Sequence, residues 1–373
     1  MKRNFICCFL CLSLLLVLTM PFPAAMSELK ALNDMDTSLI PDGTIALVIS
    51  PANDNQPRIF YAIHGITMDE DMLSIGVRQI CTDPLLTIYK EYTSNVSELH
   101  IRQTNEFTKD QPIVGSYCEV YIEKDPDGET FSDRWCNLRS IKNIPHGYYM
   151  DETISFSLSD LGNIDEKISL RMDYNCIPVP GTLHGHPLCR LSIDLADYLT
   201  PANMPDLRSL DFSLLPEDTI AVVPSSLDCE HPEIVYAIHG IAQDDETLSV
   251  NVMQLSMDPQ WMIYDADTEG MSEQEIRWVH DYPKDQPIVG SYCEGYIGKE
   301  SDDPREQWAY YKQDASIPCG NNMDEQFTFL LSEIEDGDEK SIFQMNYNCI
   351  PVPGVIYDTP HCLMSIDVSD YLK

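Results

Sequence analysis

The sequence predicts an all-β protein built from two homologous, immunoglobulin-like β-sandwich domains in tandem, each stapled by disulfides. Two observations carry this prediction. Most motifs of the first half return in the second half, and hydrophobic residues alternate with other residues along many short segments. Alternation with a period of two indicates strands whose successive side chains point to opposite faces. We find no long stretch with the period of an amphipathic helix.

The duplication sets the predicted domain boundaries. The shared motifs are KDQPIVGSYCE (109–119 and 284–294), YAIHGI (61–66 and 236–241), YNCIPVPG (174–181 and 347–354), and SIDLADYL (192–199) with SIDVSDYL (365–372). We therefore expect sandwich domains at 36–199 and 211–373, joined by a linker at 200–210. The proline and polar content of that linker is typical of a connecting segment. Each repeat is long enough to bury a core of its own.

The first 25 residues have the layout of a secretory signal peptide. Lys2 and Arg3 precede an apolar run from residue 5 to residue 20, and the small residues Ala24 and Ala25 follow. The apolar run is shorter than the ~20 residues that a membrane-spanning helix needs. We expect a secreted or otherwise extracytoplasmic protein with no membrane span in the mature chain.

The charge balance restricts the classes of partner. The chain has 61 Asp and Glu residues against 23 Lys and Arg residues, which gives a formal net charge of −38. Nucleic acid is excluded as a partner because phosphate binding requires a basic surface. The acidic surface either keeps an exported protein soluble or binds cations, and we favour the first interpretation.

The cysteines predict a set of disulfides, because exported proteins oxidise their thiols. Cys176 and Cys189 have the same spacing as Cys349 and Cys362, although the residues between them differ. The predicted pairs are Cys176–Cys189, Cys349–Cys362, Cys118–Cys136 and Cys293–Cys319, with Cys81 and Cys229 unassigned. An alternative pairs Cys118 with Cys176 as a bridge between the two sheets of a sandwich. The sequence does not decide between these connectivities.

The residues shared by both repeats allow a Ser-His-Asp site on paper, and we reject it. The candidates are Ser116 and Ser291, His64 and His239, and Asp110 and Asp285. Ser116 alternates onto the face that carries Cys118 and Val120, which points it into a core. The segment IVGSYCE also lacks the strained turn of a nucleophile elbow. We predict no catalytic residue, and we expect each histidine to be hydrogen-bonded at a strand end, with ligand binding as the alternative.

Two surface features are candidates for binding. In each repeat, the strand that begins with IVGSYCE has an outer face that carries two tyrosines and a carboxylate. These strips suit a sugar or a peptide: Tyr117, Glu119 and Tyr121, and Tyr292, Glu294 and Tyr296. If the acidic surface binds cations, two acidic hairpin tips would each supply part of a calcium shell: Asp69, Glu70 and Asp71, and Asp244, Asp245 and Glu246. No other cofactor is expected.

These observations favour a non-enzymatic binding, adhesion or envelope-associated protein whose partner is a protein or a glycan. One alternative is an exported hydrolase that uses paired carboxylates on carbohydrate or peptide substrates. Another is a structural spacer without a specific ligand. The oligomeric state is not predicted.

Overall fold

The computed structural model describes most of the strand-forming parts of the chain. The described residues are 32–50, 59–81, 87–89, 95–104, 106, 113–124, 134–137, 149–161, 168–178, 189–195, 198–199, 206–225, 234–256, 262–264, 270–279, 281, 284, 288–299, 316–318, 322–332, 341–350 and 362–369. The signal peptide predicted at residues 1–25 lies outside them. Among the described helices, none has the length and apolar character needed to cross a membrane.

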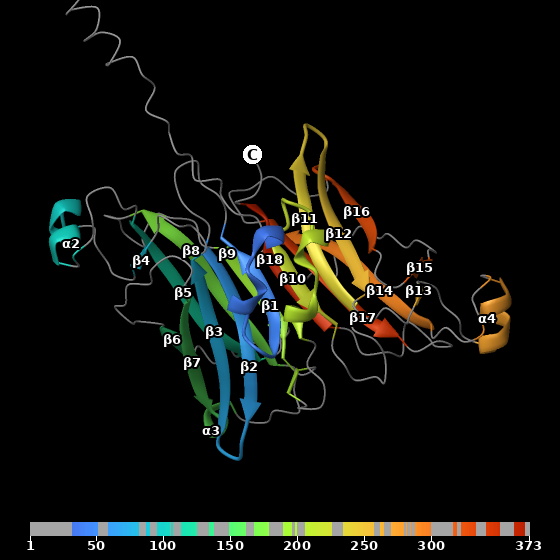
Figure 1. The fold of residues 1–373 in the computed structure, drawn as a ribbon, viewed down its shortest axis with the longest axis horizontal. Helices are drawn as coiled ribbons and strands as arrows, with labels where there is room; N and C mark the ends of the chain where they lie inside the picture. The colour runs from blue at the N-terminus through green and yellow to red at the C-terminus, as the bar shows by residue number, and fades with distance from the viewer. Residues whose placement is uncertain are drawn as a thin grey trace, which may run out of the picture.

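Two β-sheets packed face to face form the fold, so the all-β prediction is confirmed (Figure 1). Sheet A has eight antiparallel strands in the order β16-β12-β11-β10-β1-β2-β3-β7. Their bounds are β1 Thr44–Ile49, β2 Ile59–Met68, β3 Met72–Cys81, β7 Tyr149–Ser157, β10 Ala221–Pro224, β11 Ile234–Gln243, β12 Thr247–Ser256 and β16 Asn322–Leu330.

Sheet B has ten strands, with the path β15-β13-β14-β17-β18-β9-β8-β5-β4 and β6 paired to β5. Their bounds are β4 Thr87–Tyr89, β5 Ile113–Lys124, β6 Arg134–Asn137, β8 Ile168–Pro178, β9 Cys189–Asp194, β13 Met262–Tyr264, β14 Ile288–Lys299, β15 Ser316–Pro318, β17 Ser341–Ile350 and β18 Cys362–Asp367. The pairs β4–β5 and β13–β14 are parallel, and the others are antiparallel.

Three short α-helices accompany the sheets among the described residues. Helices α2 (Glu98–Thr104) and α4 (Glu273–Val279) lie at opposite ends of the molecule, and α3 (Leu158–Leu161) follows β7 (Figure 1). The sequence did not predict α2 and α4. Seven residues give too few turns for a helical period to stand out, and one residue of each helix, Ile101 or Ile276, is buried.

Both sheets pass from one repeat into the other. In sheet A, β1 pairs with β10, with Leu47 opposite Val222. In sheet B, β9 pairs with β18, with Ser192 opposite Ser365. Each repeat therefore supplies half of each sheet, and the two halves join edge to edge at these strand pairs. The physical reason is that β1 and β9 would otherwise be open edges with unpaired backbone groups.

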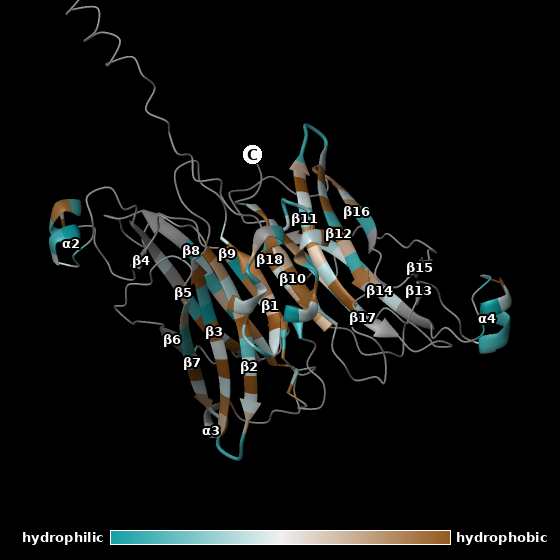
Figure 2. Ribbon diagram, in the orientation of Figure 1, coloured by the Kyte–Doolittle hydropathy of each residue, from teal (hydrophilic) through white to brown (hydrophobic). Residues whose placement is uncertain are grey.

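A layer of short 3₁₀ helices begins each repeat: η1 (Leu32–Asp34) and η2 (Thr37–Leu39), then η4 (Leu207–Ser209) and η5 (Phe212–Leu214). Every residue of β1 is buried, so both of its faces are covered. In Figure 2, brown hydrophobic segments alternate with white and teal ones along the strands. Leu32, Leu207 and Phe212 belong to the same buried cluster. The segment predicted as a linker thus ends in a packed element.

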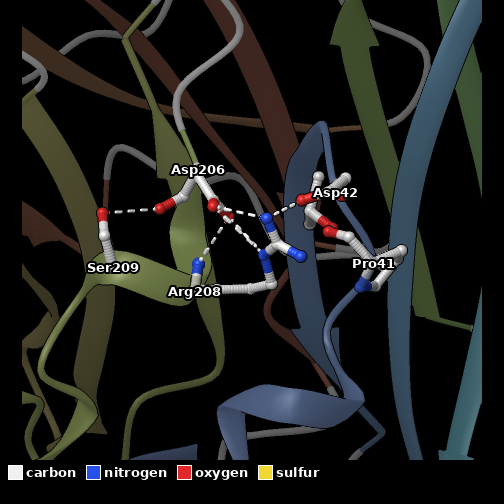
Figure 3. A network of polar contacts seen from close by, with 6 residues as sticks. Pro41, Asp42, Asp206, Arg208 and Ser209 are labelled. Atoms are coloured by element: carbon white, nitrogen blue, oxygen red, sulfur yellow. Dashed lines mark hydrogen bonds and ion pairs between the residues drawn. The ribbon is translucent and has the colours of Figure 1, made fainter.

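One ion-pair network crosses the seam between the repeats (Figure 3). The guanidinium of Arg208 contacts Asp206, with a distance of 2.7 Å between Nη2 and Oδ2, and also contacts Asp42 of the first repeat. All three side chains are well exposed. Because solvent screens exposed pairs, we expect a contribution below about 1 kcal/mol. The buried strand pairings, rather than this network, hold the repeats together.

A β-bulge explains why YAIHGI occurs twice. Gly65 and Gly240 both have φ +58, a conformation that residues with a Cβ rarely adopt. The register of β2 on β3 shifts just after His64, and the register of β11 on β12 shifts just after His239. The strand continues beyond the glycine in both repeats, so each histidine lies at a bulge rather than at a strand end.

The two repeats fill the space between the sheets with different side chains at one pair of facing positions. The first repeat places Val120 on β5 and Ile154 on β7, and both are buried. The second repeat has Gly295 and Phe327 at the matching positions. A Cβ added to Gly295 would lie 2.7 Å from the Phe327 ring. The large aromatic ring therefore fills the space that a valine side chain fills in the first repeat.

We predict that Gly295→Val destabilises the protein by about 1–3 kcal/mol through overpacking. The double variant Gly295→Val/Phe327→Ile recreates the pair of the first repeat and should recover most of that loss. Urea unfolding of the wild type, both single variants and the double variant measures the coupling. A double variant that loses the sum of the two single effects contradicts this packing account.

Candidate functional site

Ser116 of the shared motif lies inside the sandwich, within a hydrogen-bond network between the sheets. Its hydroxyl donates to Oε1 of Gln79 on β3. The hydroxyl of Tyr61 on β2 lies 3.0 Å from Ser116 Oγ and donates to the carbonyl of Asn175 on β8 at 3.1 Å. The Tyr61 ring packs against the Tyr174 ring at 5.1 Å between centroids. These groups join sheet A to sheet B.

The second repeat repeats this network. The hydroxyls of Tyr236 and Ser291 lie 3.0 Å apart, and Ser291 donates to Oε1 of Gln254. The rings of Tyr236 and Tyr347 have centroids 4.9 Å apart. The serine of KDQPIVGSYCE is therefore a buried structural group in both repeats.

The histidines lie away from these serines. His64 Nε2 is 2.7 Å from Oδ1 of Asp151 on β7, and Arg78 also contacts that carboxylate. His239 Nε2 is 2.9 Å from Oδ1 of Asp324 on β16. Ser116 bonds within the core, whereas His64 bonds at the partly exposed outer side of sheet A. The described residues therefore do not bring serine and histidine together, and Asp110 and Asp285 lie outside them.

Sequence reasoning missed the partners of the histidines, although a signal was present. The tripeptide Met-Asp-Glu, which also occurs at 68–70, lies at the matching positions 150–152 and 323–325 of the two repeats. Its aspartate bonds to the histidine on the outer face, and its glutamate alternates to the inner face, where Glu325 is 2% exposed. An alignment that matches 150–152 with 323–325 would have identified it, whereas the tripeptide alone would not, because it also occurs at 68–70.

The acidic hairpin tips use one carboxylate each to form the turn. Oδ1 of Asp69 accepts hydrogen bonds from the backbone N–H groups of Asp71 (2.9 Å) and Met72 (2.8 Å). Oδ1 of Asp244 does the same for Glu246 and Thr247, and these backbone bonds lower the pKa of Asp244. Within the described part of the chain, His, Cys, Asp and Glu form no group of three placed to hold a metal ion.

The predicted disulfides involve side chains outside the described residues. Cys118, Cys189, Cys293 and Cys362 are buried, but the side chains of their predicted partners Cys136, Cys176, Cys319 and Cys349 are not described, and neither are those of Cys81 and Cys229. The backbone register places Tyr174 opposite both Cys118 and Cys189, and Cys176 opposite Ser116. A Cys118–Cys176 bond would therefore link neighbouring strands of sheet B. The interpretation of that pair as a bridge between sheets is wrong.

The outer face of sheet B carries a row of polar and aromatic residues across six strands. We call it the polar row: Tyr121, Arg171, Ser192, Ser365, Gln344 and Tyr296, each directly opposite the next. All six are partly exposed. With strands about 4.8 Å apart, the row is about 24 Å long. It begins and ends with a tyrosine, because the two repeats meet between Ser192 and Ser365.

A dense charged network occupies the end of the row in the first repeat. Tyr121 donates to Glu119 Oε2 at 2.5 Å, and the Arg171 guanidinium lies 4.9 Å from the centre of the Tyr121 ring. Arg171 Nη2 and Arg190 Nε donate to the Asp173 carboxylate at 2.7 and 3.0 Å. Burial raises the pKa of Asp173, but the two arginines outweigh burial and hold that pKa below its ordinary value.

The end in the second repeat is nearly uncharged. Tyr296 donates to Glu294, as Tyr121 does to Glu119. Burial and this bond raise the pKa of the Tyr296 phenol. However, Gln344, Asn346 and Leu363 replace the two arginines and the aspartate. The predicted strip members Tyr117 and Tyr292 have side chains outside the described residues.

The comparisons with known proteins leave the family open. No family model and no curated protein matches the chain. Among solved structures, one described as "pT26-6p" aligns with 89% of this chain and 66% of its own length, at 10% identity and a TM-score of 0.20. The CBM22-1-CBM22-2 tandem domain of Xyn10C from Paenibacillus barcinonensis aligns with 91% of this chain and 96% of its own, at 8% identity and a TM-score of 0.17. Neither likeness carries an argument.

We predict that Ser116→Ala lowers the free energy of unfolding by about 1–3 kcal/mol, because it leaves buried polar groups without their partner. Ser291→Ala should cost a similar amount. Ser155→Ala is the control, since its bond to Ser74 lies at an exposed site, and we expect a change within about 0.5 kcal/mol. Urea unfolding measures all three. Equal losses in the core and control variants would contradict a structural role for the shared serine.

We predict that Asp173→Asn weakens the acid sensitivity of the fold. Because the pKa of Asp173 is lower in the folded protein, the stability that its ionised form contributes is present above the unfolded pKa of about 3.9. That stability disappears as the pH falls through the lower folded value. The variant should be less stable than wild type at pH 7, and the gap should narrow below about pH 4. A gap that stays constant from pH 7 to pH 3 in urea unfolding would show that these ion pairs do not contribute.

Proposed function

We propose that this protein is an exported, non-enzymatic binding protein that holds its ligand on the outer face of sheet B. In this proposal each repeat is an immunoglobulin-like sandwich unit stapled by the predicted disulfides. The polar row is the observation that carries the proposal. It places aromatic and hydrogen-bonding side chains along a line of about 24 Å on paired strands, and a sheet fixes such groups more firmly than loops do.

The chemistry of the row suits an extended ligand. Tyr121 and Tyr296 each combine a ring surface with a hydroxyl, which is typical of binding surfaces that are apolar at one point and wet at the next. Ser192, Ser365 and Gln344 between them can donate and accept hydrogen bonds. A glycan chain or a peptide lying across the strands would meet these groups in sequence.

The described residues give little support to a hydrolase. Glycoside hydrolysis needs two carboxyl groups about 5–9.5 Å apart. Glu119 and Asp173 lie directly opposite each other on neighbouring strands, but Tyr121 engages the first carboxylate, and Arg171 and Arg190 engage the second. Glu119 and Glu294 lie toward opposite ends of the row, about five strand spacings or 24 Å from each other. Ser116 and Ser291 are engaged inside the core. Binding without turnover is therefore the function that we assign.

Mature protein applied to arrays of immobilised neutral and acidic glycans and of peptides tests this proposal. The double variant Tyr121→Ala/Tyr296→Ala should lose at least about tenfold in affinity, which corresponds to about 1.4 kcal/mol. Trp278→Ala is the matched control, because Trp278 is an aromatic residue on α4 with 83% of its surface exposed. Loss of binding in the control but not in the double variant would place the site elsewhere. Release of reducing ends or cleaved peptide would contradict the non-enzymatic assignment.

A further inference from the structure

We infer that the ligand subsite lies in the second-repeat half of the polar row, and that it accepts an uncharged polyhydroxy ligand such as a segment of neutral glycan. This inference rests on the proposed function and adds to it which half binds and what class of ligand it takes. It is drawn from a comparison of two matching surfaces within one molecule.

The first-repeat half is occupied by its own side chains. Both Arg171 and Arg190 donate to Asp173, and the Arg171 guanidinium lies over the Tyr121 ring. A ligand would have to displace a cation from the ring face and compete with charge-assisted hydrogen bonds, which are about twice as strong as neutral ones. This half is therefore a poor subsite and serves to rigidify the sheet.

The second-repeat half has open capacity at the same positions. Gln344 replaces Arg171, so a guanidinium no longer covers the ring at that position. Asn346 replaces Asp173. Its side chain is hydrogen-bonded to the Tyr296 phenol, but its buried Oδ1 has no hydrogen-bond partner among the described residues. A buried acceptor without a hydrogen-bond partner lowers the stability of a protein by about 1–3 kcal/mol. A ligand hydroxyl can satisfy this oxygen after a neighbouring side chain rotates, and such rotations are common at binding surfaces.

The composition of this half indicates the ligand class. Tyr296 and Leu363 offer apolar surface, which suits the C–H face of a sugar ring. Glu294, Gln344 and Ser365 offer hydrogen-bonding groups, with a single formal charge among them. An anionic ligand is disfavoured by that carboxylate and by the net charge of −38. A hydroxyl-rich neutral chain would contact every group in the second-repeat half of the polar row, whereas a cationic peptide would contact mainly the Glu294 carboxylate.

A transplant of residues between the repeats tests the inference. The triple variant Gln344→Arg/Asn346→Asp/Leu363→Arg builds the charged network of the first repeat into the second. It should abolish retardation in native gels that contain soluble xylan, mixed-linkage β-glucan or galactomannan. The reverse variant Arg171→Gln/Asp173→Asn/Arg190→Leu should create a second subsite, so that titration with an oligosaccharide of the retarding polymer gives a stoichiometry near two instead of one.

Single variants keep the test decisive if a triple variant fails to fold. Tyr296→Ala should lose at least about tenfold in affinity, and Tyr121→Ala should lose clearly less; thermal unfolding of both verifies the fold. If Tyr121→Ala shows the larger loss, the assignment to the second repeat is overturned while the proposed function stands. Binding of a lysine-rich peptide at Tyr296, without retardation by any polysaccharide, would overturn the ligand class. Failure of the wild type to bind any glycan or peptide would overturn the proposed function itself.

Discussion

The hydrogen bonds that Ser116 and Ser291 make across the core are the constraint on which the rest of the structure depends. Polar groups inside an apolar core are tolerated only when their partners are in place. Each network therefore fixes the spacing of the sheets and the register of β5 or β14. The same strand that points Ser116 inward points Glu119 and Tyr121 outward. The buried hydrogen bonds of Ser116 and Ser291 therefore also determine where the side chains of β5 and β14 lie on the outer face.

The seam adds a second level of organisation. Because β9 pairs with β18, the outer face of sheet B is one platform with approximate twofold symmetry. Symmetry gives it two matching ends, and substitutions have made those ends chemically different. Arg171 and Gln344 hold equivalent positions, yet one covers a ring and the other leaves it available. One continuous outer face therefore has a densely charged end in the first repeat and a nearly uncharged end in the second.

The sequence predicted the longer strands and the inward direction of Ser116, because alternation reports which face a side chain occupies. It did not predict the short strands β6 and β15. It did not predict the pairing of β1 with β10, because alternation does not report which strand lies alongside. The fully buried segments TIALVI and AVVP were compatible with any buried neighbour. For the candidate site, Glu119 and Tyr121 were identified from one strand alone. Their neighbours Arg171 and Arg190 come from strands 50 or more positions away in the chain, so only the sheet order reveals them.

The exchange of Val120 and Ile154 for Gly295 and Phe327 has a consequence for how this gene can change. The two halves began as copies, yet a genetic exchange that moved β5 into the place of β14 would now set a valine against the Phe327 ring. Such a recombinant would fold poorly. Exchange of β5 alone is therefore disfavoured, and only an exchange that also brings Ile154 into the place of Phe327 restores the packing of the first repeat.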